Sequence, residues 1–121
     1  MSKEDAKEST IIDHADVRRM LMTIKSYVDA MRYMMYDNQL MLDVVYFGEG
    51  EFKEFGEERC GILTPITKAW ISDLGVELSS MAIQIYGGMG YVEETGVAQY
   101  LRDSRIAPIY EGTNGIQALD L

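Results

Sequence analysis

A glutamate near the end of the chain is the residue whose surroundings could support acid–base chemistry. Glu111 stands in the segment 109–114, Ile-Tyr-Glu-Gly-Thr-Asn, where Gly112 and Thr113 predict the start of a last helical segment over residues 114–121. A carboxylate that is aimed at a substrate can act as a general base. Glutamate is also an ordinary residue at the start of a helix, where the helix dipole favours a negative charge. The position alone leaves both interpretations of Glu111 open.

A second break in the chain is the glycine-rich segment 87–90, Gly-Gly-Met-Gly. It is not a dinucleotide-binding fingerprint, because it follows a predicted helix and lacks the strand and the last glycine of that motif. The sequence also has no Gly-Lys-Ser/Thr phosphate-binding loop. One histidine, His14, and one cysteine, Cys60, are too few for a typical metal site, so none is predicted, and no intrachain disulfide can form.

Two long amphipathic helices are predicted to position these two segments. Residues 13–47 have apolar side chains at alternating steps of four and three, with Asn38 at the one polar position, which is a helix-packing pattern. Residues 48–61 are predicted to be an acidic loop, because glycines interrupt them and glutamates predominate. The pair Thr64-Pro65 then predicts a helix start, with threonine as the N-cap and proline at the first helical position. This second helix is predicted to end at Gly87 or Gly88 in a left-handed cap.

Each long helix should bury one apolar seam against the other. The first seam consists of Val17, Leu21, Ile24, Val28, Met31, Met35, Leu42 and Val45. The second consists of Thr67, Ile71, Leu74, Leu78, Met81 and Ile85. Shorter helices are predicted over residues 95–105 and 114–121. The predicted fold is therefore all-α, a partial up-down bundle of two long antiparallel helices and two short ones, with residues 1–12 as a frayed, charged lead-in and residues 13–121 as one domain.

The overall composition argues against several classes of partner. The 121 residues have a formal net charge of -9, which disfavours nucleic acid and anionic membrane surfaces as partners. No apolar run approaches the roughly 18 residues that are needed to span a bilayer. The first residues lack the apolar core of a secretory signal, and a single cysteine suits a reducing compartment. We therefore expect a cytoplasmic location.

Three motifs, in this order, resemble the C-terminal helical domain of the FAD-dependent acyl-CoA dehydrogenases. They are Ala-Ile-Gln-Ile-Tyr-Gly-Gly-Met-Gly-Tyr at 82–91, Leu-Arg-Asp-Ser-Arg-Ile at 101–106 and Ile-Tyr-Glu-Gly-Thr-Asn at 109–114. The stretches 16–21, 64–70 and 114–121 are similar to the branch that includes the 3-methylmercaptopropionyl-CoA dehydrogenases. The resemblance covers nearly all of the chain from Ile11 onward.

The resemblance implies the introduction of an α,β double bond into an acyl-CoA thioester. In the family, the glutamate of the Tyr-Glu-Gly-Thr motif removes the α-proton while a hydride leaves the β-carbon for FAD, and Glu111 matches that glutamate. The backbone N–H of the same glutamate is one donor to the thioester oxygen in the family. The adjacent Gly112 would let the chain approach the substrate closely.

The resemblance also implies cofactor contacts. Gln84, Gly87 and Gly88 match the family segment that touches the ADP half of FAD, usually that of a neighbouring subunit. Thr113 matches a hydroxyl near the flavin pyrophosphate. The family often has a glutamine at the position of Gly115, so one side-chain contact is missing here.

Partners follow from the same resemblance. They are the acyl-CoA substrate, the electron-transfer flavoprotein and further copies of the chain in a homo-oligomer. The family's N-terminal helical domain, its middle β-domain and the first helix of its C-terminal domain have no counterpart in this sequence. The chain is therefore expected to be a fragment of an oxidoreductase that is inactive alone. The alternative is a non-enzymatic helical oligomerisation or interaction module derived from the family.

Overall fold

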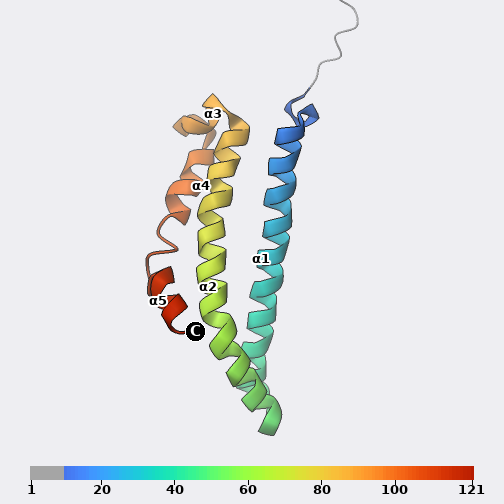
Figure 1. Cartoon of the computed structure of the whole chain (residues 1–121), viewed down its shortest axis with the longest axis vertical. Coiled ribbons are helices and arrows are strands. Elements are labelled where there is room, and N and C mark those ends of the chain that lie inside the picture. Colours follow the sequence, from blue (N-terminus) through green and yellow to red (C-terminus); the bar gives the residue numbers. More distant parts are fainter. Residues whose placement is uncertain (1–9) are drawn as a thin grey trace, which may run out of the picture.

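Two long helices form an antiparallel hairpin in the computed structural model, which describes residues 10–121 (Figure 1). Helix α1 spans Ala15–Phe47 and helix α2 spans Gly50–Tyr86. A short 3-10 turn, η1, Ile11–Asp13, precedes α1, and its Asp13 carboxylate accepts a hydrogen bond of 2.9 Å from the Thr10 N–H. The larger part of the predicted lead-in, residues 1–9, lies outside the described residues.

Four shorter elements follow α2; the three α-helices among them pack against it, whereas the 3-10 turn contacts, of the described elements, only the two α-helices on either side of it. They are α3, Gly88–Tyr91, the 3-10 turn η2, Glu93–Thr95, α4, Val97–Ser104, and α5, Asn114–Leu119. Figure 1 shows α4 and α5 along the side of α2 that faces away from α1. Every regular element between residues 10 and 121 is helical. This confirms the predicted all-α arrangement of two long helices with shorter ones.

The connection between the long helices is shorter than predicted. Only Gly48 and Glu49 separate α1 from α2, so the predicted loop over residues 48–61 and the predicted helix start at Thr64-Pro65 are both wrong. Gly56 is buried against α1, where an added Cβ would lie 2.8 Å from Cγ1 of Val44. Pro65 is buried inside α2, which bends over its first turns, drawn in green in Figure 1.

Packing explains why these residues are helical here. Glycine and proline in a helix interior cost about 1 and about 3 kcal/mol relative to alanine. The absence of a side chain at Gly56 lets the two helices approach closely at Met41 and Val44, and this contact between helices outweighs the local cost. The glutamates of this stretch stay exposed. Gly56, which breaks helices in other contexts, is therefore the site of a close helix–helix contact here and not part of a loop.

The buried core differs in part from the predicted seams. The buried apolar residues are Met20, Met41, Val44, Leu74, Leu78, Val97 and Ala98. Leu74 and Leu78 confirm part of the second seam, whereas Leu21 and Met35 of the first seam are exposed. In a hairpin each long helix contacts its partner along a narrow stripe, so the rest of a wide apolar face stays open. Trp70 on α2 packs edge-on against Tyr27 on α1, with ring centroids 6.2 Å apart.

None of the helices in residues 10–121 has the length and apolar character that crossing a membrane requires.

Candidate functional site

Glu111 lies in a turn with an unusual backbone conformation. Its φ is +53°, and the φ of the next residue, Gly112, is +82°. Among the described residues, Glu111 is the one non-glycine residue with a positive φ. A left-handed conformation costs a residue with a Cβ about 1–2 kcal/mol, and such strain clusters at functional sites. The carboxylate side chain is exposed on a chain segment whose shape must be held by other residues.

Helix α2 holds this turn through Lys68. Its ammonium Nζ donates to the carbonyl oxygen of Gly112 at 2.6 Å and to Oδ1 of Asn114 at 2.8 Å. A hydrogen bond from a charged donor contributes about 1.5–3 kcal/mol. That range is large enough for Lys68 to offset the cost of the left-handed Glu111.

Asn114 fastens the start of α5 to the same part of α2. Its Nδ2 donates to the carbonyl oxygen of Ala69 at 3.1 Å and to Oδ1 of Asp73 at 2.7 Å, and the hydroxyl of Ser72 lies 3.0 Å from it. The Asn114 backbone N–H also donates to the carbonyl oxygen of Pro108 at 3.1 Å. Residues far apart in the sequence are thus joined through one asparagine side chain.

Two weaker contacts complete the turn on the side of α5. The hydroxyl of Thr113 is the N-cap of α5 and accepts a hydrogen bond from the Ile116 N–H at 3.4 Å. Nε2 of Gln117 donates to the carbonyl oxygen of Glu111 at 3.3 Å. The carbonyl groups of both left-handed residues therefore accept hydrogen bonds from side chains of other elements.

Glu111 borders a hollow of about 330 Å³ between α1, α2 and the segment 107–111. Most of its lining side chains are apolar or small; they are Met35, Thr67, Ile71, Gly75, Ala107 and Tyr110. Oγ1 of Thr67 is buried without a hydrogen-bond partner. A carboxylate at the edge of a mainly apolar hollow can accept a proton from a carbon acid whose chain enters that hollow.

Thr113 faces a different hollow from Glu111, although the two residues belong to one turn. The second hollow has a volume of about 580 Å³ and is bordered by Asp73 and Glu77 of α2 and by Arg105. The turn therefore presents its carboxylate on one side and its hydroxyl on another. The two predicted site residues Glu111 and Thr113 are close in sequence, but they border different hollows.

Gln84, Gly87 and Gly88 lie at the other end of α2 and are exposed. Gln84 is twelve residues beyond Ser72 on α2, which corresponds to about 18 Å of helix. Gly87 ends α2 with φ +60° and ψ −143°. The positive φ was predicted, but this ψ lies outside the left-handed helical region, so the predicted type of cap is wrong. A Cβ added at Gly87 or Gly88 would meet no atom within 4 Å.

Within the segment 87–90, Gly90 rather than Gly87 or Gly88 is the glycine that close packing requires. A Cβ added there would lie 2.4 Å from the carbonyl oxygen of Ile83 and 2.9 Å from Cβ of Tyr86. This constraint on Gly90 was not predicted from the sequence. The one sign of it in the sequence is the place of Gly90 two residues beyond the Gly-Gly pair, where the chain folds back on the end of α2.

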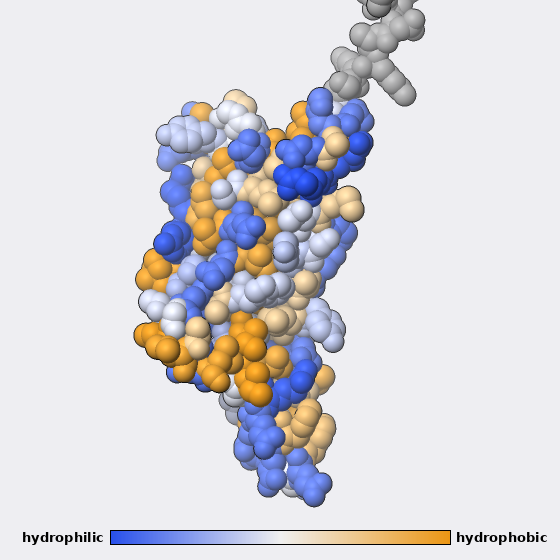
Figure 2. All heavy atoms as spheres, in the orientation of Figure 1, coloured by the Kyte–Doolittle hydropathy of each residue, from blue (hydrophilic) through white to orange (hydrophobic). Residues whose placement is uncertain are grey.

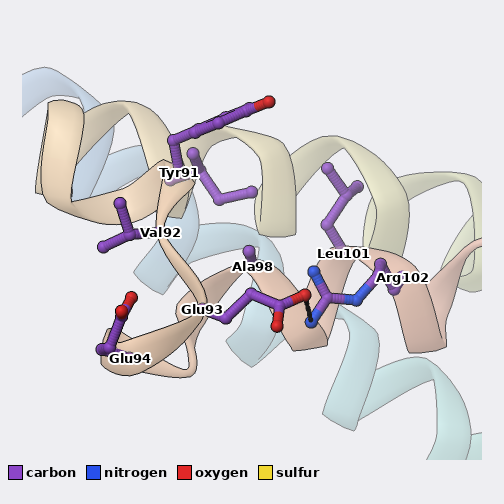
Figure 3. Close-up of a pocket in the computed structure, with 8 residues that line it drawn as sticks. Tyr91, Val92, Glu93, Glu94, Ala98, Leu101 and Arg102 are labelled. Carbon is purple, nitrogen blue, oxygen red and sulfur yellow. Dashed lines mark ion pairs between the residues drawn. The ribbon is translucent and has the colours of Figure 1, made fainter.

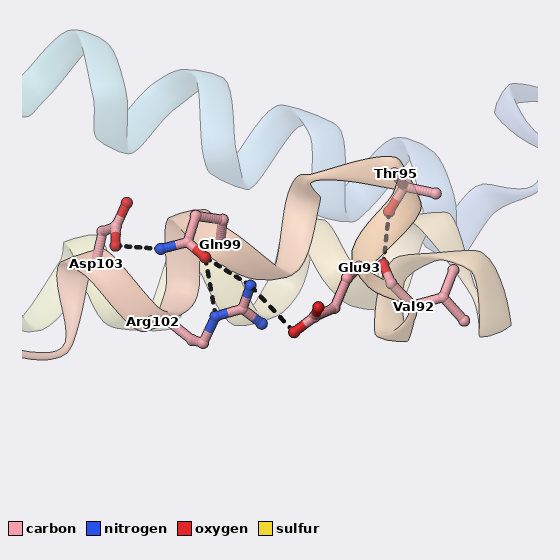
Figure 4. A network of polar contacts seen from close by, with 6 residues as sticks. All are labelled: Val92, Glu93, Thr95, Gln99, Arg102 and Asp103. Carbon is pink, nitrogen blue, oxygen red and sulfur yellow. Dashed lines mark hydrogen bonds and ion pairs between the residues drawn. The ribbon is translucent and has the colours of Figure 1, made fainter.

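A further hollow of about 570 Å³ adjoins this glycine segment (Figure 3). Figure 3 shows Arg102 of α4 pointing toward Glu93 of η2, and Nη2 of Arg102 lies 3.8 Å from Oε1 of Glu93. Figure 4 shows Gln99 between Arg102 and Asp103. Oε1 of Gln99 accepts from Nε of Arg102 at 3.0 Å, and its Nε2 donates to the Asp103 carboxylate. The motif at 101–106 is thus part of a polar network on the surface of α4.

Within residues 10–121, no group of three or more histidine, cysteine, aspartate or glutamate side chains is arranged to hold a metal ion.

A comparison with known protein families identifies the domain. The family "Acyl-CoA dehydrogenase, C-terminal domain" matches residues 1–121. The chain belongs to this family. Its two long helices, its glycine segment and the turn at Glu111 are therefore parts of an acyl-CoA dehydrogenase C-terminal domain, and the predicted resemblance is confirmed.

Individual relatives are similar over most of the chain. A 3-methylmercaptopropionyl-CoA dehydrogenase of Ruegeria pomeroyi is 43% identical over 111 residues, which are 92% of this chain and 19% of the relative. A butyryl-CoA dehydrogenase of Syntrophomonas wolfei is 39% identical over 91% of this chain and 18% of the relative. A broad-specificity linear acyl-CoA dehydrogenase of Mycobacterium tuberculosis is 30% identical over 99% of this chain and 20% of the relative. The chain spans about a fifth of the length of these relatives.

Proposed function

We propose that this acyl-CoA dehydrogenase C-terminal domain supplies the base for the α,β-dehydrogenation of an acyl-CoA thioester, and that Glu111 is the base. The observation that carries the proposal is the position of Glu111 at the border of a mainly apolar hollow, on a left-handed turn anchored to α2. Family membership supports the reaction class.

The chemistry requires an aimed base and a stabilised oxygen. The α-proton of a thioester is weakly acidic, so the carboxylate has to be directed at it, and the developing enolate oxygen needs hydrogen-bond donors. The backbone N–H of Glu111 makes no hydrogen bond to another described residue. It is thus available as one donor beside the carboxylate of the same residue. Gly112 has no side chain to obstruct the approach of a thioester.

The exposed residues of the chain fit contacts with FAD at two places. FAD supplies the acceptor for the hydride that leaves the β-carbon. Gln84, Gly87 and Gly88 present an amide side chain and two open glycines in which an added Cβ meets no neighbour. The exposed Thr113 accepts the Ile116 N–H and keeps its own hydroxyl proton for donation. We assign the first place to the ADP half of FAD from a neighbouring subunit and Thr113 to a pyrophosphate.

Larger assemblies are part of the proposal. Several large apolar side chains of the described residues are exposed, and Figure 2 shows hydrophobic residues gathered over α5 and the adjacent part of α2. Leu119 on α5 is 85% exposed. Such surfaces suit further domains of a longer protein and other copies in a homo-oligomer. The complete enzyme would take acyl-CoA as its substrate and pass electrons to electron-transfer flavoprotein, with a cytoplasmic location. The 121 residues alone are expected not to reduce flavin with acyl-CoA.

A chimera tests the role of Glu111. Residues 10–121 replace the matching segment of the Ruegeria pomeroyi relative, and turnover is measured per bound flavin. E111Q should lower kcat by about 10³-fold with the flavin spectrum retained, since a positioned general base contributes about 10²–10⁴-fold. The control is E58Q, at an exposed glutamate of α2 far from the turn. An E111Q chimera that turns over like the wild-type chimera would overturn the proposal.

A further inference from the structure

The Lys68 ammonium lies beside the turn that presents Glu111, yet it does not pair with the carboxylate. Within the described residues, no ion pair joins Lys68 to an acidic side chain. Its two hydrogen bonds go to the Gly112 carbonyl oxygen at 2.6 Å and to Oδ1 of Asn114 at 2.8 Å. A partly buried ammonium usually needs partners with negative charge or dipole, and here a backbone carbonyl and an amide supply them. Lys68 therefore acts on the backbone of the turn.

We infer that Lys68 is a positioning residue that holds Glu111 in the geometry for proton abstraction; this inference rests on the proposed function. The carbonyl group it binds belongs to Gly112, the second of the two left-handed residues. Fixing that carbonyl fixes the peptide plane between Gly112 and Thr113, directly after the left-handed pair, and thereby restrains the turn from which the Glu111 side chain projects. Lys68 also borders the same hollow as Glu111, so its removal would change the turn from within the site.

The choice of acceptor has a chemical consequence. A direct ion pair with the Glu111 carboxylate would occupy the oxygen atoms that have to accept the α-proton. By binding the next carbonyl group, Lys68 holds the turn and leaves the carboxylate free of an ion pair. Asn114 strengthens this arrangement, because its Oδ1 accepts from Lys68 while its Nδ2 donates to the Ala69 carbonyl and Asp73. The same few residues of α2 thereby hold both sides of the turn.

The other contacts of the turn cannot replace Lys68. The Gln117 amide reaches the Glu111 carbonyl oxygen at 3.3 Å, which is a longer and uncharged hydrogen bond. The Thr113 hydroxyl caps α5 at 3.4 Å and does not contact the Glu111 peptide. Lys68 is thus the one charged donor on the left-handed pair among residues 10–121.

Turnover of the chimera described above tests the inference with three lysine variants. K68M removes the donor and retains an unbranched side chain, K68R restores a charged donor, and K25M changes an exposed lysine of α1 that pairs with Asp29. We expect K68M to lower kcat per bound flavin by about 10–100-fold with KM changed less than about threefold, because small misplacement of a reacting group has effects of this size. K68R should recover most of kcat, and K25M should match the wild type.

Normalisation to bound flavin separates positioning from folding. A lysine that only stabilised the domain would reduce the amount of holoenzyme and leave kcat per flavin unchanged, and that result would overturn the inference. The outcome for E111Q is independent. If E111Q is inactive and K68M is fully active, the positioning role fails and the proposed function stands; if E111Q is fully active, the proposed function itself fails.

Amide hydrogen exchange on the 121-residue chain provides a readout that needs no enzyme activity. The Asn114 N–H is held by the Pro108 carbonyl oxygen, so its exchange reports on the integrity of the turn. K68M should accelerate exchange at Asn114 at least about tenfold relative to K25M, with the amides in the middle of α1 unchanged. Equal protection of Asn114 in K68M and K25M would contradict the anchoring on which the inference depends.

Discussion

Helix α2 holds two later segments of the chain in different ways, the Glu111 turn near Lys68 and the glycine segment near Tyr86. Near Lys68 and Asp73, side-chain hydrogen bonds tie the Glu111 turn to the helix. At Gly87–Tyr91 the chain folds back without such bonds to α2, and the close approach of Gly90 to Ile83 decides the geometry. The first end is strained and tethered, whereas the second is compact and open on its outer surface.

The difference would suit the two tasks proposed for these segments, a base at Glu111 and a cofactor contact at the glycine segment. A base has to point in one direction, and a directional tether of charged and amide groups can enforce this against the local preference of the backbone. A surface that contacts a large cofactor needs the right shape and few protruding side chains. Backbone packing at a glycine can set that shape without hydrogen bonds from side chains. The same helix therefore offers directional hydrogen bonds at one end and steric fit at the other.

Breaking the compact end should have the largest effect on stability. G90A places a Cβ against the carbonyl oxygen of Ile83 and the Cβ of Tyr86, both of which belong to α2. We expect the free energy of unfolding to fall by about 3 kcal/mol, because overpacking against atoms that cannot move away is costly. Urea denaturation followed by circular dichroism measures the change. The control is G88A, whose Cβ meets no atom within 4 Å; comparable losses in both variants would show that packing at Gly90 is not the cause.

Breaking the tethered end should cost somewhat less. N114A removes the hydrogen bonds to Ala69, Asp73 and Ser72, and leaves their partly buried acceptors without this partner. We expect a loss of about 2 kcal/mol in the same urea experiment. Q117A, which loses one hydrogen bond of 3.3 Å, should cost no more than about 0.5 kcal/mol. If Q117A lowered the free energy of unfolding as much as N114A, the turn would be held mainly by its contact with α5 and not by its contacts with α2.

The polar network on the surface of α4 should contribute least to the free energy of unfolding. R102M removes the hydrogen bonds to Gln99 and the ion pair with Glu93, but the Arg102 side chain is 50% exposed. We expect a change of about 0.5 kcal/mol, since exposed ion pairs are screened by water and salt. The difference between R102M and wild type should shrink further at high salt. A loss near that of G90A would mean that polar contacts hold both ends.

A pH titration supplies a smaller effect that involves neither end. Burial raises the pKa of the Cys60 thiol above its ordinary value. The folded chain therefore keeps this proton to higher pH than the unfolded chain, and the associated stability is present below the unfolded pKa and lost as the pH rises through the folded pKa. The stability of the wild type should fall slightly more steeply than that of C60S in alkaline solution. Parallel curves of stability against pH for the wild type and C60S would show that Cys60 does not contribute to this pH dependence.

The sequence predicted the elements with strong helical periodicity and missed those that depend on contacts between elements. The first helix was placed at 13–47 and spans Ala15–Phe47, because its apolar pattern is continuous. The loop predicted at 48–61 is helical, because Gly56 signals a close contact with α1 that no local pattern reveals. Pro65 was expected at a helix start and lies buried in a helix interior.

The site shows a similar division. The motif around Glu111 pointed to the family from the sequence, and the family comparison confirms the family, while the role of Glu111 remains a proposal. The role of Lys68 in the turn could not, because a lysine on an amphipathic helix gives no sign of the carbonyl group that it will bind 44 residues later in the chain. Gly90 escaped notice because its constraint arises from the backbone of Ile83 after the chain has folded back.

The uninterrupted course of α2 from Lys68 to Tyr86 also limits how such a domain can change its length during evolution. Inserting one residue between Asp73 and Gln84 would rotate one end of the helix by about 100° relative to the other and lengthen it by about 1.5 Å. Insertions in the two-residue connection at Gly48 and Glu49 would leave that relation intact. Length variation should therefore be tolerated at the tip of the hairpin and rejected between the turn that carries the carboxylate and the glycine segment.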